Sequence, residues 1–257
     1  MDMQRIKRVG VAAAVNGASV LKEHFGKLRS VRKKEAIDLV TEADFRSEAA
    51  IIETITRAFP EHGILAEESG MRDGSDSRWI IDPLDGTTNF VHNLPLFCAS
   101  IAFAVADDVL AGFVLAPLTG ELFVGMKGEG AQLNGTPITV SDTAVLTDSL
   151  LVTGFPYDHQ TLFEPLMARF GRCLAASQGV RRLGSAALDL CYVACGRFEG
   201  FWEQHLKPWD TAAGFIIASE AGARTTVFSG APYCLDADEI ACTNNRIHDD
   251  LLKLLEL

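Results

Sequence analysis

The chain has 257 residues, of which 48% are hydrophobic, and this length suits one large domain or two fused subdomains. Its net charge of −11 argues against nucleic-acid binding through a basic surface, so we expect no direct contact with nucleic acid. The most apolar stretch, 97–106, is too short to cross a membrane, and the charged start does not read as a secretory signal.

The first half of the chain is expected to begin with two helices and to continue with strands. Apolar residues at helical spacing predict helices over 4–25 and 42–59. Thr41 and Asp44 resemble a capping box at the start of the second helix, and Pro60 ends it. Strands are then predicted at 63–66, 78–81, 97–106, 109–115, 121–126 and 130–133, with a turn at 134–135.

In the second half, predicted strands and helices alternate. We expect strands at 150–154, 180–183, 198–203, 223–227 and 239–242, and helices at 161–174, 185–195, 211–221 and 246–255. Such alternation favours an α/β unit with a mixed or parallel sheet. We therefore divide the chain near Thr143 into an α+β subdomain, 1–143, with a mostly antiparallel sheet and most of the metal ligands, and an α/β subdomain, 144–257.

The six cysteines give a prediction about the compartment. They are scattered, and no CxxC pair occurs. We expect all six to be reduced core residues of a cytoplasmic protein.

The strongest chemical signal is the segment 79–90, WIIDPLDGTTNF. We expect a buried strand that delivers Asp82 at its carboxyl end, where Pro83 stops the ladder, and Asp85 follows. Two carboxylates that point into one cleft can hold hard divalent cations through oxygen. A lone Asp-Gly pair is usually a turn, but two aspartates and a proline directly after an apolar strand outweigh that interpretation.

The same segment offers backbone groups to a ligand. Gly86 and Thr87 open a short predicted helix, and their N–H groups can bind a phosphate. The carbonyl of Leu84, freed from the strand, can serve as a further metal ligand.

Two more carboxylates stand at element ends. Glu67 follows a short predicted strand; the alternative to metal binding is that Glu67 and Glu68 are solvated residues of a loop. Asp210 opens a predicted helix; the alternative to metal binding there is N-capping of the helix. With Asp82 and Asp85 they supply enough charge for two or three Mg²⁺ ions, because like charges cannot cluster without cations. The sequence has no HxH or CxxC ligand set, so zinc is disfavoured, and oxygen ligands favour Mg²⁺, with Mn²⁺ as the alternative.

Four segments in order along the chain make the sequence resemble the inositol monophosphatase family. They are 38–44, 67–69, 82–90 and 209–214. The resemblance spans almost the whole chain, and Ala66, where many members carry glycine, is a mild departure. It implies a layered αβαβα sandwich of the sugar phosphatase type, a homodimer and a lithium-sensitive site.

The resemblance also implies roles for individual residues. Glu67, Asp82 and the Leu84 carbonyl are implied ligands of one Mg²⁺, and Asp82, Asp85 and Asp210 of a second. The implied catalytic residues, which orient the attacking water, are Glu67, Thr87 and Asp44. The implied substrate contacts are Asp85, Gly86, Thr87, Gly184, Ser185, Ala186, Glu203 and Asp210, with the loop 184–186 and Glu203 facing the substrate ring.

The predicted activity is Mg²⁺-dependent hydrolysis of inositol monophosphate, or of a similar small sugar or polyol phosphate, by a metal-activated water. Fructose 1,6-bisphosphate, histidinol phosphate, NADP and a nucleotide bisphosphate are alternative substrates. Four basic residues could bind a second anionic group, although surface charge is the commoner role of such residues: Arg181, Arg182, His205 and Lys207.

Two other classes of protein fit the sequence less well. A haloacid dehalogenase-type phosphatase needs two aspartates two residues apart, whereas Asp82 and Asp85 are three apart. A non-catalytic regulatory or binding relative usually loses a ligand, whereas every candidate ligand is present here.

Overall fold

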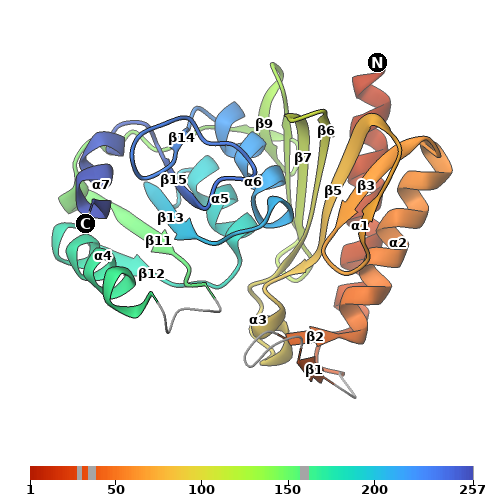
Figure 1. The fold of residues 1–257 in the computed structure, drawn as a ribbon, viewed down its shortest axis with the longest axis horizontal. Helices are drawn as coiled ribbons and strands as arrows, with labels where there is room; N and C mark the ends of the chain where they lie inside the picture. The colour runs from red at the N-terminus through yellow and green to blue at the C-terminus, as the bar shows by residue number, and fades with distance from the viewer. Residues whose placement is uncertain (28–30, 34–38, 157–161, 257) are drawn as a thin grey trace.

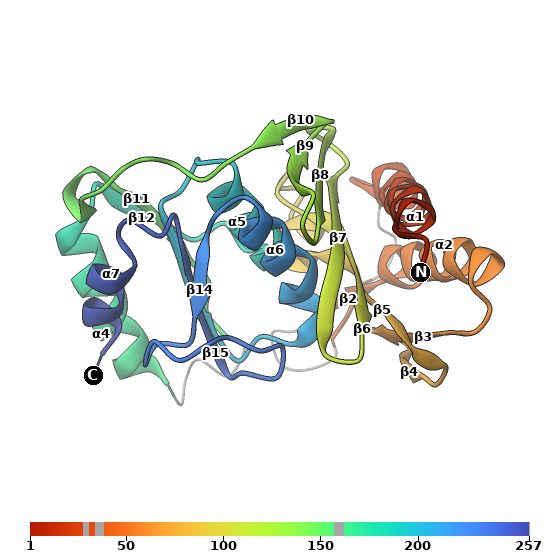
Figure 2. The same ribbon diagram turned by 90° about the horizontal axis from the view of Figure 1, so that it is seen from above.

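The computed structural model describes residues 1–27, 31–33, 39–156 and 162–256. Asp38, in the first motif segment, and Thr161, at the expected start of a helix, lie outside the described residues. Helices and sheets alternate in five layers (Figure 1), which Figure 2 shows edge on from α1 and α2 to α4 and α7. The αβαβα architecture expected from the resemblance is confirmed.

The outer layer on the N-terminal side consists of helices α1, Met3–His24, and α2, Glu42–Ala58. At the start of α2, the N–H of Ala43 donates to Thr41 Oγ1 at 3.1 Å, and the N–H of Thr41 donates to Asp44 Oδ2 at 2.9 Å. This confirms the predicted capping box and holds the Asp44 carboxylate, which is buried.

The first sheet has eight strands in the order β10-β9-β8-β7-β6-β5-β3-β4, and only the β3–β5 pair is parallel. The strands are β3 (His62–Ala66), β4 (Gly70–Arg72), β5 (Ser75–Asp85), β6 (Cys98–Val105), β7 (Asp108–Ala116), β8 (Glu121–Met126), β9 (Gly130–Leu133) and β10 (Thr136–Ile138). A separate ribbon pairs β1, Val31–Lys33, with β2, Leu39–Thr41. The sequence did not predict β1, β2, β4 or β10, because each has only three residues and shows no period-two alternation.

The middle layer contains α5, Ala186–Ala194, and α6, Pro208–Glu220, which lie between the two sheets. Every residue of α5 is buried. Helix α6 lies directly on the first sheet at two glycines: a Cβ on Gly112 would come within 2.5 Å of the Ala213 carbonyl, and one on Gly125 within 2.7 Å of Ile217 Cα. This close approach fixes the start of α6, and with it Asp210, relative to the first sheet.

The second sheet has the order β12-β11-β13-β15-β14. Its strands are β11 (Leu150–Thr153), β12 (Gly179–Arg181), β13 (Gly200–Gln204), β14 (Arg224–Thr226) and β15 (Glu239–Thr243). Strand β11 is parallel to both neighbours and β15 is antiparallel, which confirms the expected mixed sheet. The 3-10 turn η1, Leu146–Asp148, precedes strand β11. The last layer consists of helices α4, Phe163–Ala176, and α7, His248–Leu255.

The cysteines are all free thiols, and one of them departs from the expectation. Cys234 is exposed, so the prediction that all six are core residues was wrong for it. It lies in the irregular segment between β14 and β15, which offers little apolar surface to cover it. In the described part of the chain, no helix is long and apolar enough to span a membrane.

A buried histidine at the start of α7 predicts a pH-dependent stability. Thr226 Oγ1 lies 2.9 Å from Nε2 of His248, and Thr243 Oγ1 lies 3.0 Å from Nδ1. Burial, and then the charge of Arg224, lower the pKa of His248 from 6.5 to about 4. The unfolded chain therefore takes up this proton first as the pH falls, and the stabilisation is lost between pH 6.5 and 4.

We expect His248 to account for about 2 kcal/mol of lost unfolding free energy between pH 7 and pH 4. Urea unfolding of the wild type and of His248→Asn at both pH values measures this, because the variant cannot take up the proton. An equal loss in both proteins would contradict the assignment.

Candidate active site

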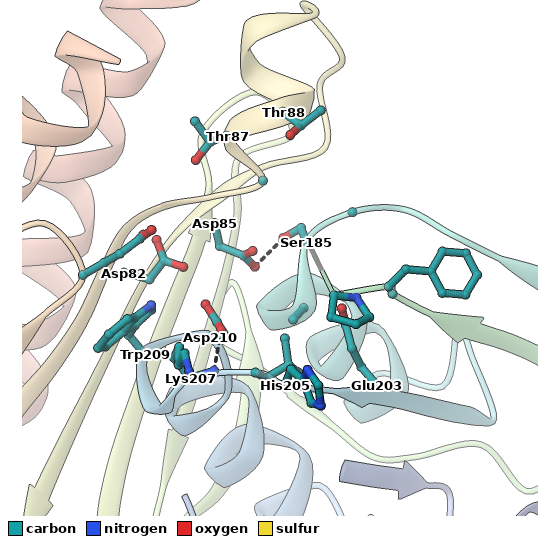
Figure 3. Close-up of a pocket in the computed structure, with 18 of the residues that line it drawn as sticks. Asp82, Asp85, Thr87, Thr88, Ser185, Glu203, His205, Lys207, Trp209 and Asp210 are labelled. Carbon is teal, nitrogen blue, oxygen red and sulfur yellow. Dashed lines mark hydrogen bonds between the residues drawn. The ribbon is translucent and has the colours of Figure 1, made fainter. Parts of the chain in front are cut away.

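A cavity of about 360 Å³ opens where the two sheets and the middle helices meet (Figure 3). This volume is within the range of small-molecule sites. Its walls come from the end of β3, the β5–α3 turn, the end of β11, the start of α5, and the β13–α6 connection. The predicted residues on its walls are Glu67, Asp82, Leu84, Asp85, Gly86, Thr87, Gly184, Ser185, Ala186, Glu203 and Asp210.

The β5–α3 turn departs from the prediction in one respect. Strand β5 does not end at Asp82 but resumes at Asp85, which pairs with Cys98 after a break in register. The ladder is interrupted only at Pro83 and Leu84, because proline cannot donate a ladder bond. The break frees Leu84, whose N–H donates to Asp82 Oδ1 at 2.9 Å.

Gly86 carries the chain from β5 into the short helix α3, Thr87–Val91. Its φ is +97°, and a Cβ there would lie 2.9 Å from the Leu96 carbonyl. Only glycine meets both requirements without strain. The turn therefore presents the backbone of Gly86 and Thr87 at the cavity wall.

Burial, and then mutual repulsion, raise the pKa of the carboxylates in the cavity. In Figure 3, Asp82, Asp85 and Asp210 lie near one another at the cavity, and the Asp85 carboxylate is turned toward Ser185. Burial raises the pKa of Asp82 well above its usual value, and three neighbouring carboxylates add to this: Glu67, Asp85 and Asp210. Burial likewise raises the pKa of Asp85 to about 6 and that of Asp210 to about 8. The site therefore has an excess of negative charge.

Asp85 links the two halves of the molecule. Ser185 Oγ donates to its Oδ2 at 2.6 Å, and the N–H of Ala187 donates to the same oxygen at 2.8 Å. Asn89 makes a second link, because its Nδ2 donates to the Leu183 carbonyl at 2.7 Å. These bonds place the loop 184–186 beside the β5–α3 turn.

Asp44 does not line the cavity but lies behind Thr87. Thr87 Oγ1 lies 3.2 Å from Asp44 Oδ1 and 3.0 Å from the Leu84 carbonyl, so its single proton is directed inward. Thr41 Oγ1 donates to Asp44 Oδ2 at 2.6 Å. Burial raises the pKa of Asp44 to about 6 despite these bonds. The predicted Thr87–Asp44 pair is therefore present as a hydrogen-bonded unit.

The remaining wall is basic and aromatic. Of the four basic residues considered from the sequence, Arg182, His205 and Lys207 line the cavity, and Arg181 does not. The sequence did not assign the segment 154–156, Thr88, Gln204, Leu206 or Trp209 to the site. Gly154 follows a strand in the parallel part of the sheet, and the carboxyl ends of such strands are where α/β proteins bind ligands. That signal could have identified it.

The donor set fits a hard divalent cation, although its members do not form a closed group. Among the described residues, no three His, Cys, Asp or Glu side chains are grouped so as to hold a metal ion. Unscreened carboxylates repel one another, and Asp85 and Asp210 are held by hydrogen bonds, the latter from the Lys207 N–H at 2.7 Å. Their oxygens are nevertheless the ligands that Mg²⁺ prefers, and a cation would relieve the repulsion that adds to the effect of burial on their pKa.

The layered fold and its cavity with clustered acidic side chains are those of the sugar phosphatase class. Residues 2–256 match the model of the inositol monophosphatase family. An inositol-1-monophosphatase of Synechocystis is 44% identical over 99% of this chain and 90% of that protein. The Nus factor SuhB of Pasteurella multocida is 38% identical over 99% of this chain and 97% of that protein.

A solved structure agrees with these sequence relatives. The inositol monophosphatase of Anabaena superposes with a TM-score of 0.91 at 42% identity, covering 99% of this chain and 96% of that one. The chain therefore belongs to the inositol monophosphatase family, which confirms the resemblance. It is a phosphatase, a phosphoric monoester hydrolase of a metal-dependent family.

Proposed function

We propose that this phosphatase hydrolyses inositol monophosphate, or a similar small polyol phosphate, with Mg²⁺ held by Glu67, Asp82, Asp85, Asp210 and the Leu84 carbonyl. The observation that carries the proposal is the convergence of these acidic groups on one cavity beside the β5–α3 turn. Their number suits two or three ions, and Mn²⁺ is the alternative to Mg²⁺.

The residues divide the chemistry between them. A bound divalent cation supplies a Lewis acid that makes water more acidic and offsets charge on the phosphate. Because the Thr87 hydroxyl proton points toward Asp44 and Leu84, its oxygen can accept a hydrogen bond from the attacking water. Glu67 accepts a hydrogen bond from the other hydrogen of the water and can take up that proton as the oxygen attacks, so the two acceptors aim the water oxygen at phosphorus. The backbone N–H groups of Gly86 and Thr87 hold the phosphate oxygens.

The opposite wall is proposed to bind the alcohol part of the substrate. The segment 184–186 contacts the ring, and Glu203 accepts hydrogen bonds from its hydroxyl groups. The bisphosphates and NADP remain the alternative substrates, because Arg182, His205 and Lys207 stand on the same wall and could hold a second anion.

A regulatory role is the second candidate, because several relatives are named Nus factor SuhB. A purely regulatory protein does not need the acidic residues and the hydroxyl group that catalysis requires. The complete set of acidic residues and the Thr87–Asp44 pair therefore favour catalysis, alone or beside such a role.

Turnover on a panel of phosphate esters tests the proposal. We expect purified protein to hydrolyse inositol 1-phosphate faster than fructose 1,6-bisphosphate, histidinol phosphate or NADP, to require Mg²⁺, and to be inhibited by lithium. EDTA should abolish the activity, and Mg²⁺ should restore it. No hydrolysis of any ester with Mg²⁺ would overturn the proposal and favour the regulatory role. The proposed cytoplasmic homodimer is tested by light scattering and cell fractionation.

A further inference from the structure

The carboxylate of Glu203 lies directly against the backbone of Gly154. Strands β11 and β13 are parallel neighbours in which Thr153 pairs with Trp202, so Gly154, directly after β11, lies beside Glu203, the next residue of β13. Thr153 Oγ1 donates to the Trp202 carbonyl at 2.7 Å and fixes this pairing. Both Gly154 and Glu203 line the cavity.

The Glu203 carboxylate occupies the space that a side chain at position 154 would fill. A Cβ built on Gly154 would lie 2.1 Å from both carboxylate oxygens of Glu203 and 2.2 Å from its Cδ. Real atoms do not approach this closely, so Glu203 would have to move. The three nearest atoms all belong to the end of one flexible side chain, so a methyl group here displaces the carboxylate rather than the backbone.

The charges around Glu203 restrict where it could go instead. Burial raises the pKa of Glu203 to about 8, and among the described residues the charge of Arg182 favours the anion, whereas Asp210 and Asp85 oppose it. A further acid, Asp189 on α5, also feels the charge of Glu203; it is 1% exposed, and in the described structure neither of its carboxylate oxygens has a hydrogen-bond partner. Movement of the Glu203 carboxylate toward these acids is unfavourable. Its position over Gly154 is therefore specific.

We propose that Gly154 is a specificity-determining residue, whose missing side chain seats the Glu203 carboxylate where it binds the hydroxyl groups of a polyol phosphate. This inference rests on the proposed function and deepens it. It assigns selectivity for hydroxylated esters to a contact between two strand ends, away from the phosphate-binding turn.

The test compares Gly154→Ala with the wild type on two esters that differ in hydroxyl groups. Inositol 1-phosphate carries them around its ring, and 4-nitrophenyl phosphate has none. We expect the ratio of kcat/KM for inositol 1-phosphate to that for 4-nitrophenyl phosphate to fall about tenfold, as for a lost hydrogen bond in a buried site, mostly through KM. Gly171→Ala, on α4 with open space around it, is the matched control and should keep the wild-type ratio.

A double variant separates this role from a general loss of structure. Glu203→Gln should lower the same ratio, and Gly154→Ala combined with it should lower the ratio little further, because both act through one carboxylate. If Gly154→Ala leaves the ratio unchanged, or if the effects of the two substitutions multiply in the double variant, the inference about Gly154 is wrong, but the proposed function is not affected. A wild-type protein that hydrolyses neither ester would overturn the proposed function, and this inference with it.

Discussion

Asp82→Asn is expected to lower kcat/KM for the preferred ester by about a thousandfold, equal to about 4 kcal/mol of transition-state stabilisation. Asp82 lies at the centre of the acidic group, where the Leu84 N–H fixes one of its oxygens. Asparagine keeps the size but removes the charge, and a neutral amide is a poor ligand for a hard cation. Calorimetric titration should show weaker Mg²⁺ binding, which gives a measurement independent of turnover.

The stability of the same variant checks the electrostatic reason. In metal-free protein, loss of one of four mutually repelling carboxylates should raise the melting temperature, whereas added Mg²⁺ should stabilise the variant less than the wild type. Asp73→Asn, an exposed aspartate outside the cavity wall, removes the same charge and should change none of these quantities. Wild-type Mg²⁺ affinity and turnover in Asp82→Asn would contradict the assignment of the metal site.

Local signals in the sequence were sufficient for much of the N-terminal half. The capping box of Thr41 and Asp44 depends on residues three apart, and the structure contains it as predicted. The segment 79–90 is likewise a strand, a turn and a short helix in immediate succession. Each feature is decided by contacts within a few residues, so sequence patterns can report it.

Contacts between distant segments were not accessible in the same way. The bonds from Ser185 and Ala187 to Asp85 join residues about a hundred positions apart, and the position of the Glu203 carboxylate depends on Gly154, directly after another strand. No pattern in one sequence reports such pairs, because they arise only when the layers pack. The resemblance placed Ser185 and Glu203 at the site, but the reason for their positions comes from the structure.

The Thr87–Asp44 pair gives the second large expected effect. Thr87→Val keeps the shape and the backbone N–H but removes the hydroxyl that aims the water. We expect kcat to fall about a hundredfold, with KM and Mg²⁺ affinity changed less than about threefold, because neither phosphate nor metal binding uses this hydroxyl. Thr119→Val, in an exposed turn, is the matched control and should leave kcat unchanged.

A double-variant cycle shows whether Asp44 acts through Thr87. Asp44 lies outside the cavity wall and faces Thr87 Oγ1 at 3.2 Å, so it can reach the reacting water only through that hydroxyl. Asp44→Asn should therefore lower kcat in the wild type but have little further effect in Thr87→Val. Circular dichroism checks that the capping box of α2 survives, since the asparagine side chain retains one acceptor oxygen for it. If the two losses multiply in the double variant, Asp44 contributes by another route, and the proposed aiming of the water through Thr87 is wrong.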